Sequence, residues 1–145
     1  ADVLGLYMVT SLNEAGVLQG NIDDFYITFV ASVYRSVRFG ASSAHGRANM
    51  ITFNTLMNSG CLERTKKGLI VKVPEMKIAI RNLAAELLHL QGDGNLIGVK
   101  KMLAERGGID ESLQTELNQI QKNKIPVDIV FEQGTSVLGL DRFKK

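Results

Sequence analysis

Two histidines and one cysteine are the side chains of this sequence whose chemistry best suits acid–base catalysis or metal binding. His45 lies in a gap of small and polar residues, with Gly40 and Ala41 before it and Gly46 after it. Small residues let a ligand or a second backbone come close. An imidazole titrates near neutral pH and can donate a hydrogen bond or a proton there. His45 therefore fits two interpretations, a group positioned to act on a ligand or one that only caps or crosses a helix junction.

His89 and Cys61 do not complete a recognisable site. His89 stands within LLHLQ on a leucine-rich helix, which favours a core or boundary position over a metal-ligand role. Neither histidine has a recognisable serine or cysteine partner, and no G-x-S-x-G motif occurs. Cys61 is the only cysteine, so the chain has no internal disulfide, and we expect a reducing, cytoplasmic compartment.

Composition and charge argue against several classes of partner. The 145 residues are about one domain's worth of chain, and a hydrophobic fraction of 45% is ordinary for a soluble domain. Seventeen basic and fifteen acidic side chains leave a net charge of +2, which is too balanced to indicate a nucleic-acid partner. Arg35 and Arg38 interrupt the longest apolar segment, so no run reaches the roughly 18 to 20 residues of a membrane-spanning helix. We expect no nucleic-acid or membrane partner, and we expect these two arginines to form a surface pair.

Apolar spacing predicts the helices that would hold His45. The apolar residues before the gap repeat every four positions: Phe25, Phe29, Val33 and Val37. Those after the gap repeat every three: Met50, Phe53 and Leu56. Ser42 or Ser43 can cap the second of these two helices. The same patterns, interrupted by glycine and proline, predict helices over residues 2–15, 22–39, 43–58, 95–106 and 110–122. A further helix, the fourth in chain order, is predicted to start at Pro74 and to have Gly92 as its C-cap.

Two short β-branched segments predict a small β element. Residues 66–73 read KKGLIVKV, and residues 127–131 read VDIVF. We expect these two segments to pair with each other. The sequence therefore predicts one domain over residues 1–145, mainly α, with an array of about six helices and a short two-stranded β element.

Several segments resemble one family of enzymes. The segment RSVRFGASSAHGRANM around His45 is similar to the part of the dipeptidyl peptidase III family that holds a histidine acting on the substrate. The opening ADVLGLYM resembles the end of the EExRAD motif of that family and the residues after it, with Ala1 and Asp2 as the last two letters of the motif. The later segments QGDGN, GVKKMLAERG and PVDIVFEQG resemble bacterial members.

The resemblance implies a zinc exopeptidase that removes dipeptides from the N-terminus of short peptides. It implies that His45 stabilises the oxyanion that develops during attack on the peptide bond. Arg47 and Asn49 would contact the substrate beside His45, and Lys124 would contact the far end of the peptide. Better-known animal members have an arginine where this chain has Asn49, so carboxylate binding does not carry over directly to this residue. Asp2 would support the zinc ligands from a second layer.

The zinc-binding motif HExxGH and most of EExRAD do not occur in this sequence. We therefore interpret residues 1–145 as a C-terminal fragment of a larger protein. We expect zinc in the parent, no metal in this fragment, and no hydrolysis by the fragment alone. The expected partners are an oligopeptide substrate, the missing N-terminal part of the same chain, and a second copy of the fragment through exposed apolar surface. The alternative is a non-catalytic helical interaction module, and the sequence leaves open whether the parent carries a further domain such as the Nudix module of some relatives.

Overall fold

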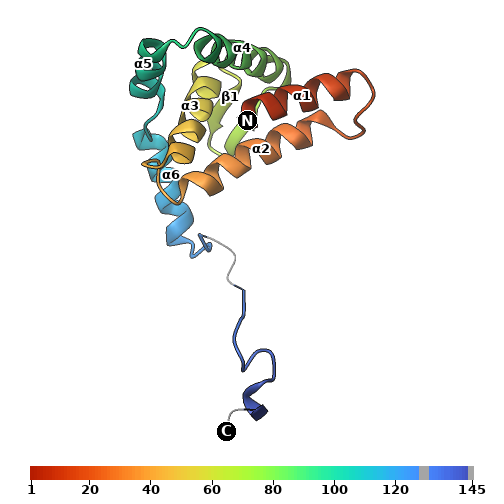
Figure 1. Ribbon diagram of the computed structural model, residues 1–145, viewed down its shortest axis with the longest axis vertical. Coiled ribbons are helices and arrows are strands. Elements are labelled where there is room, and N and C mark those ends of the chain that lie inside the picture. The colour runs from red at the N-terminus through yellow and green to blue at the C-terminus, as the bar shows by residue number, and fades with distance from the viewer. Residues whose placement is uncertain (128–130, 144–145) are drawn as a thin grey trace.

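The computed structural model describes residues 1–127 and 131–143 (Figure 1). These residues form six α-helices, one β-hairpin and one 3-10 turn, which confirms the mainly α fold class with a short two-stranded element. The helices are α1 Asp2–Glu14, α2 Ile22–Val37, α3 Ala44–Asn58, α4 Val73–Gly92, α5 Leu96–Arg106 and α6 Glu111–Lys122. The strands are β1 Leu62–Thr65 and β2 Gly68–Val71, and the 3-10 turn is Asp141–Phe143.

Most helices begin where a short polar side chain can accept a hydrogen bond from the first turn. Asn21, Ser43, Asn95 and Asp110 are the N-caps of α2, α3, α5 and α6, and each accepts from a backbone N–H two or three residues later. These caps explain why the predicted helix starts agree with the structure to within a residue. The predicted C-cap of the fourth helix was wrong, because α4 includes Gly92 and ends at the C-cap Asp93.

The core lies where α2, α3, α4 and the hairpin meet. The residues of α2 that are buried follow one helical stripe: Tyr26, Val30, Val33 and Val37. Tyr26 and Val30, and not the predicted Phe25 and Phe29, belong to this stripe. The Tyr26 hydroxyl can be buried because it lies 2.9 Å from the Thr10 hydroxyl and is hydrogen-bonded inside the core. The facing residues come from α3 and α4: Met50, Phe53, Leu56, Met76 and Ile80.

The hairpin differs from the predicted strand pair. β2 lies inside the predicted strand over residues 66–73, but its partner is the segment just before it, with Leu62 opposite Val71 and Thr65 opposite Gly68. A turn of two residues closes this pair at little entropic cost, whereas pairing with residues 127–131 would close a loop of more than fifty residues. Val127 belongs to no strand, and residues 128–130 of the other predicted strand lie outside the described residues.

No helix within the described ranges is long and apolar enough to cross a membrane. The lone cysteine, Cys61, is a free thiol in the core, where its Sγ donates to the Leu56 carbonyl oxygen at 3.1 Å. Burial raises the pKa of the Cys61 thiol, so the reactive thiolate is disfavoured. Cys61 is a packing residue and not a nucleophile.

Candidate functional site

His45 lies in the first turn of α3 with its side chain exposed. The turn begins at Ser43, whose hydroxyl accepts a hydrogen bond from the Gly46 backbone N–H at 3.0 Å. The ring is thus neither packed beneath the core nor needed to cap its own helix. Such a side chain is open to a ligand.

Gly46 fixes the place of this turn in the molecule. It is buried, and a Cβ atom added to it would lie 2.5 Å from the Gly40 carbonyl oxygen and 2.7 Å from the Cα of Ala41. The loop between α2 and α3 therefore passes directly against the first turn of α3. The small residues around His45 allow two stretches of backbone to touch, which is one of the two uses that the sequence predicted for them.

Asn49 stands one turn after His45 and is half-buried. Its side-chain amide donates to the Ser36 hydroxyl of α2 at 2.6 Å. It also lines a pocket of about 470 Å³ with Asp2, so the structure brings these two predicted site residues together. The rest of the lining is mostly apolar and comes from α1, α3, α4 and α5, including Leu4, Ile51, Leu87, Val99 and Leu103.

Arg47 and Lys124 are both exposed. They line neither this pocket nor a smaller one between the end of α2 and α6. Arg47 lies two residues after His45, which on a helix directs it away from the face that His45 shares with Asn49. Lys124 follows the end of α6 with a positive φ of 56°. His45 lines neither of these two pockets either, so the structure does not bring Arg47 or Lys124 into a common pocket with it.

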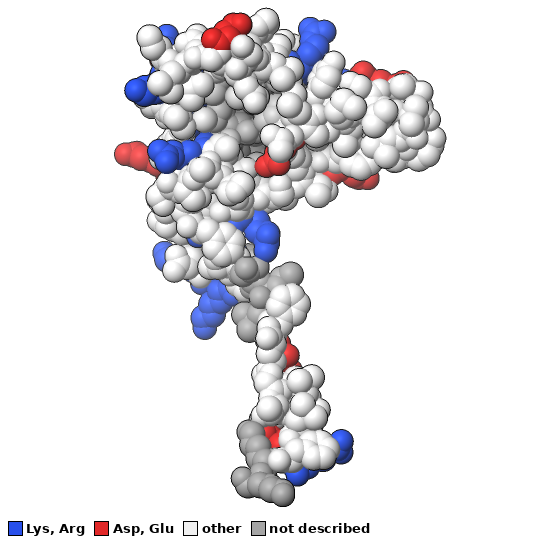
Figure 2. Space-filling view, viewed as in Figure 1, with Lys and Arg blue, Asp and Glu red and all other residues white. Residues whose placement is uncertain are grey.

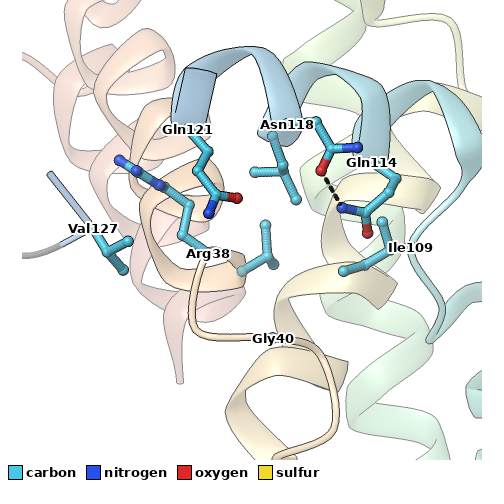
Figure 3. Close-up of a pocket in the computed structure, with 9 residues that line it drawn as sticks. Arg38, Gly40, Ile109, Gln114, Asn118, Gln121 and Val127 are labelled. Carbon is cyan, nitrogen blue, oxygen red and sulfur yellow. Dashed lines mark hydrogen bonds between the residues drawn. The ribbon is translucent and has the colours of Figure 1, made fainter. Parts of the chain in front are cut away.

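A second pocket, of about 260 Å³, lies between the end of α2 and α6 (Figure 3). Figure 3 shows Arg38 beside Gln121 of α6, with the loop at Gly40 below them. The guanidinium of Arg38 donates to the carbonyl oxygen of Ile125 at 2.5 Å and to that of Pro126 at 2.7 Å. The prediction of a simple surface pair was wrong for Arg38, and no local signal could have shown this, because its partners lie 87 and 88 residues later.

A polar network holds α6 against the rest of the fold. The Tyr34 hydroxyl donates to one carboxylate oxygen of Glu116 at 2.5 Å, and Arg64 Nε of β1 donates to the other at 2.8 Å. Arg64 also lies 3.4 Å from a carboxylate oxygen of Asp110. Burial, and then the hydrogen bond to Glu116, raise the pKa of the Tyr34 phenol above its ordinary value. The network is structural and links α2, β1 and α6.

His89 is exposed in the last turn of α4, so the predicted core or boundary position was wrong. Within residues 1–127 and 131–143, no group of three or more histidine, cysteine, aspartate or glutamate side chains could hold a metal ion. Structural and catalytic zinc sites need at least three protein ligands. These described residues alone therefore do not fit a zinc site.

Comparisons with known proteins agree with the resemblance seen in the sequence. The structure is similar to that of dipeptidyl peptidase III from Caldithrix abyssi, with a TM-score of 0.81 and 30% identity, over 88% of this chain. It is also similar to dipeptidyl peptidase III from Corallococcus sp. strain EGB, with a TM-score of 0.81 and 28% identity, over 98% of this chain. The resemblance to dipeptidyl peptidase III is thereby confirmed over most of the chain.

A plant protein shows a similar level of identity. Nudix hydrolase 3 from Arabidopsis thaliana is 30% identical over 131 residues, which are 89% of this chain. No protein-family model matches the chain. The chain spans only 17% of the plant protein and 25% and 26% of the two peptidase structures. It thus corresponds to about a quarter of a dipeptidyl peptidase III.

Proposed function

We propose that this chain is one part, the C-terminal part of the catalytic region, of a zinc-dependent exopeptidase that removes dipeptides from the N-terminus of short peptides. The observation that carries this proposal is the match to two dipeptidyl peptidase III structures, each with a TM-score of 0.81 and 28 to 30% identity. The chain forms a single domain over residues 1–145 and hydrolyses nothing by itself. The remainder of the parent supplies the zinc ligands, since the described residues hold no suitable cluster.

In this proposal His45 acts on the substrate directly. Its exposed imidazole donates a hydrogen bond to the oxyanion that forms when the scissile carbonyl is attacked. The support is its place on a turn whose backbone packs directly against the α2–α3 loop at Gly46. Preorganised donors of this kind stabilise the transition state more than the bound substrate.

The other candidate residues bind and orient. Arg47 contacts the peptide from a different face of α3 than His45, and Lys124 contacts its far end through an exposed ammonium group. Asn49 has its side-chain nitrogen engaged by Ser36, so it offers the substrate its amide oxygen. Asp2, at the rim of the same pocket as Asn49, orients a group from the rest of the parent.

The test is a His45→Ala substitution in the full-length protein, assayed on chromogenic dipeptidyl substrates. Loss of one oxyanion donor typically lowers turnover by about 100 to 1000-fold. Lys100→Ala, an exposed site on α5, is the matched control and should keep its turnover and melting temperature. Unchanged turnover in His45→Ala would remove this residue from the mechanism, and a parent gene without HExxGH and EExR upstream would defeat the peptidase proposal as a whole.

Taken alone, the fragment is proposed to self-associate. The apolar pocket beside Asp2 and exposed side chains on α1, such as Met8 at 53% and Leu12 at 38%, offer surface for a second copy. Figure 2 shows that the lobe at the right, formed by α1 and α2, carries few charged side chains on this face. Light scattering should report a species larger than a monomer; a strict monomer at tens of micromolar concentration would contradict this.

The alternative function is a non-catalytic helical interaction module, and the apolar pocket of about 470 Å³ is the observation that favours it. The apolar stripe of α4 from Met76 to Leu90 could serve such a module only in part, because Met76, Ile80 and Leu83 are buried in the core. The end of this stripe, Leu87 and Leu90, lines the pocket together with Leu88 of the same helix. A parent that binds a protein partner but cleaves no peptide would favour the module.

We also propose that the protein works in the cytoplasm. The free, buried thiol of Cys61 is suited to a reducing compartment. Fractionation of the native cells with an antibody against the chain would test the compartment directly.

A further inference from the structure

The turn after α6 contains the same hydrogen bonds as two glycine turns elsewhere in the chain. At the end of α1, the N–H groups of Gly16 and Val17 donate back to the carbonyl oxygens of Asn13 and Leu12. At the end of α4, Gly94 and Asn95 donate to Gln91 and Leu90 in the same arrangement. At the end of α6, Lys124 and Ile125 donate to Gln121 and Ile120, at 2.9 and 3.3 Å. All three ends are Schellman motifs.

The residue at the left-handed position differs. It is glycine in the first two motifs, with φ of 71° for Gly16 and 60° for Gly94. In the third it is Lys124, which among the described residues is the only non-glycine with a positive φ. A side chain makes this conformation unfavourable, and such strain persists only where the surroundings enforce it.

Arg38 contacts this turn from the end of α2. Its guanidinium donates to the carbonyl oxygens of Ile125 and Pro126, the two residues that follow Lys124. Arg38 is itself the C-cap of α2 and begins the loop that passes against Gly46. A short series of contacts therefore joins the turn of Lys124 to the turn of His45, and the close-up of the Arg38 pocket shows the loop at Gly40 across the pocket from α6 (Figure 3).

We propose that Arg38 is a positioning residue that holds the left-handed Lys124 turn against the α2–α3 loop, so that the Lys124 ammonium binds the free carboxylate of a peptide acted on at His45. The inference rests on the proposed function. Arg38 does not touch the substrate, because its donors are turned to the backbone of the turn. Lysine stands where glycine would be more stable because its charge is needed there.

The first experiment uses this chain alone and asks whether the turn is strained and held. Lys124→Gly should keep the melting temperature or raise it by about 2 to 4 °C, because glycine removes the strain. The matched control Lys122→Gly, inside the last turn of α6, should lower it by a similar amount, since glycine weakens a helix. In Arg38→Ala, hydrogen exchange of the Ile125 amide should become at least tenfold faster. A Lys124→Gly variant as destabilised as Lys122→Gly, or an unchanged exchange rate, would overturn the proposed geometry.

The second experiment uses the full-length peptidase and compares peptides with a free and an amidated C-terminus. The wild type should show a lower KM for the free acid. Arg38→Ala and Lys124→Gly should each raise that KM about tenfold, with kcat within about twofold, and should abolish the preference. Arg38→Lys should recover part of the preference, and Lys100→Ala should leave it intact.

The two failures can be told apart. A wild type that cleaves no peptide defeats the proposed function, and the positioning role with it. A wild type that cleaves peptides but shows no preference for the free acid, or keeps its preference in Arg38→Ala, defeats this inference alone.

Discussion

The start of α3 and the turn after α6 carry candidate site residues that are held in two different ways. At the start of α3, backbone lies directly on backbone, because Gly46 has no side chain to separate it from Gly40 and Ala41. At α6, long side chains reach across from other elements: Tyr34 and Arg64 to the helix, and Arg38 to the turn beyond it. The first arrangement tolerates no added atom, whereas the second can lose one contact and keep its overall shape.

Among substitutions in these two regions, Gly46→Ala should lower the free energy of unfolding most. The new Cβ meets backbone at 2.5 Å, so the loop or the helix must move, and such overpacking typically costs about 1 to 3 kcal/mol of the free energy of unfolding. Gly5→Ala is the control, because nothing lies within 4 Å of its added Cβ in α1 and alanine favours a helix by roughly 0.5 to 1 kcal/mol. Urea unfolding should show opposite signs for the two variants; equal stability of Gly46→Ala and wild type would disprove the close approach.

Glu116→Ala tests the polar network of Tyr34, Arg64 and Glu116 that holds α6. It removes the acceptor of both Tyr34 and Arg64, and hydrogen bonds to charged groups are each worth about 1.5 to 3 kcal/mol in protected sites. Because Glu116 is 30% exposed, we expect a loss near the lower end of that range. Glu63→Ala breaks the exposed pair with Lys72 and should change the stability by less than about 0.5 kcal/mol. Similar losses of stability in the two variants would show that the polar network contributes no more than a surface ion pair.

Alkaline pH should weaken the same polar network and lower the stability by a smaller amount. The pKa of Tyr34 is raised in the folded chain, first by burial and then by the hydrogen bond to Glu116, so folding favours the neutral phenol. The stability that this contributes is fully present below the unfolded pKa of about 10 and is lost as the pH rises above it. Tyr34→Phe should therefore lose less stability than the wild type between about pH 9 and 11, in thermal melts across that range.

Tyr26 is a second buried phenol that contributes to the loss of stability at alkaline pH. Its pKa is also raised by burial, so part of the alkaline destabilisation should remain in Tyr34→Phe. A variant with the full pH dependence of the wild type would mean that the Tyr34 phenol does not contribute to it.

Much of the fold could be predicted because the signals for it are local. The caps Asn21, Ser43, Asn95 and Asp110 and the apolar spacing between them define helices within a few neighbouring residues. The missed strand β1 shows the limit of such signals. LERT carries one apolar residue and gives no alternation, and it becomes a strand only because β2 folds back onto it.

The candidate site divides in the same way. The residue types and their order around His45 were enough to suggest a site and a family, because a helix junction rich in small residues can be recognised within one short segment. Only the tertiary structure showed that His89 is exposed to solvent. It also placed Asp2 and Asn49 in one pocket and brought Arg38 to the carbonyl oxygens of Ile125 and Pro126. Those contacts join residues far apart in the chain. Hydrogen bonding and packing select such partners only after the helices have assembled, so no spacing in the sequence records them.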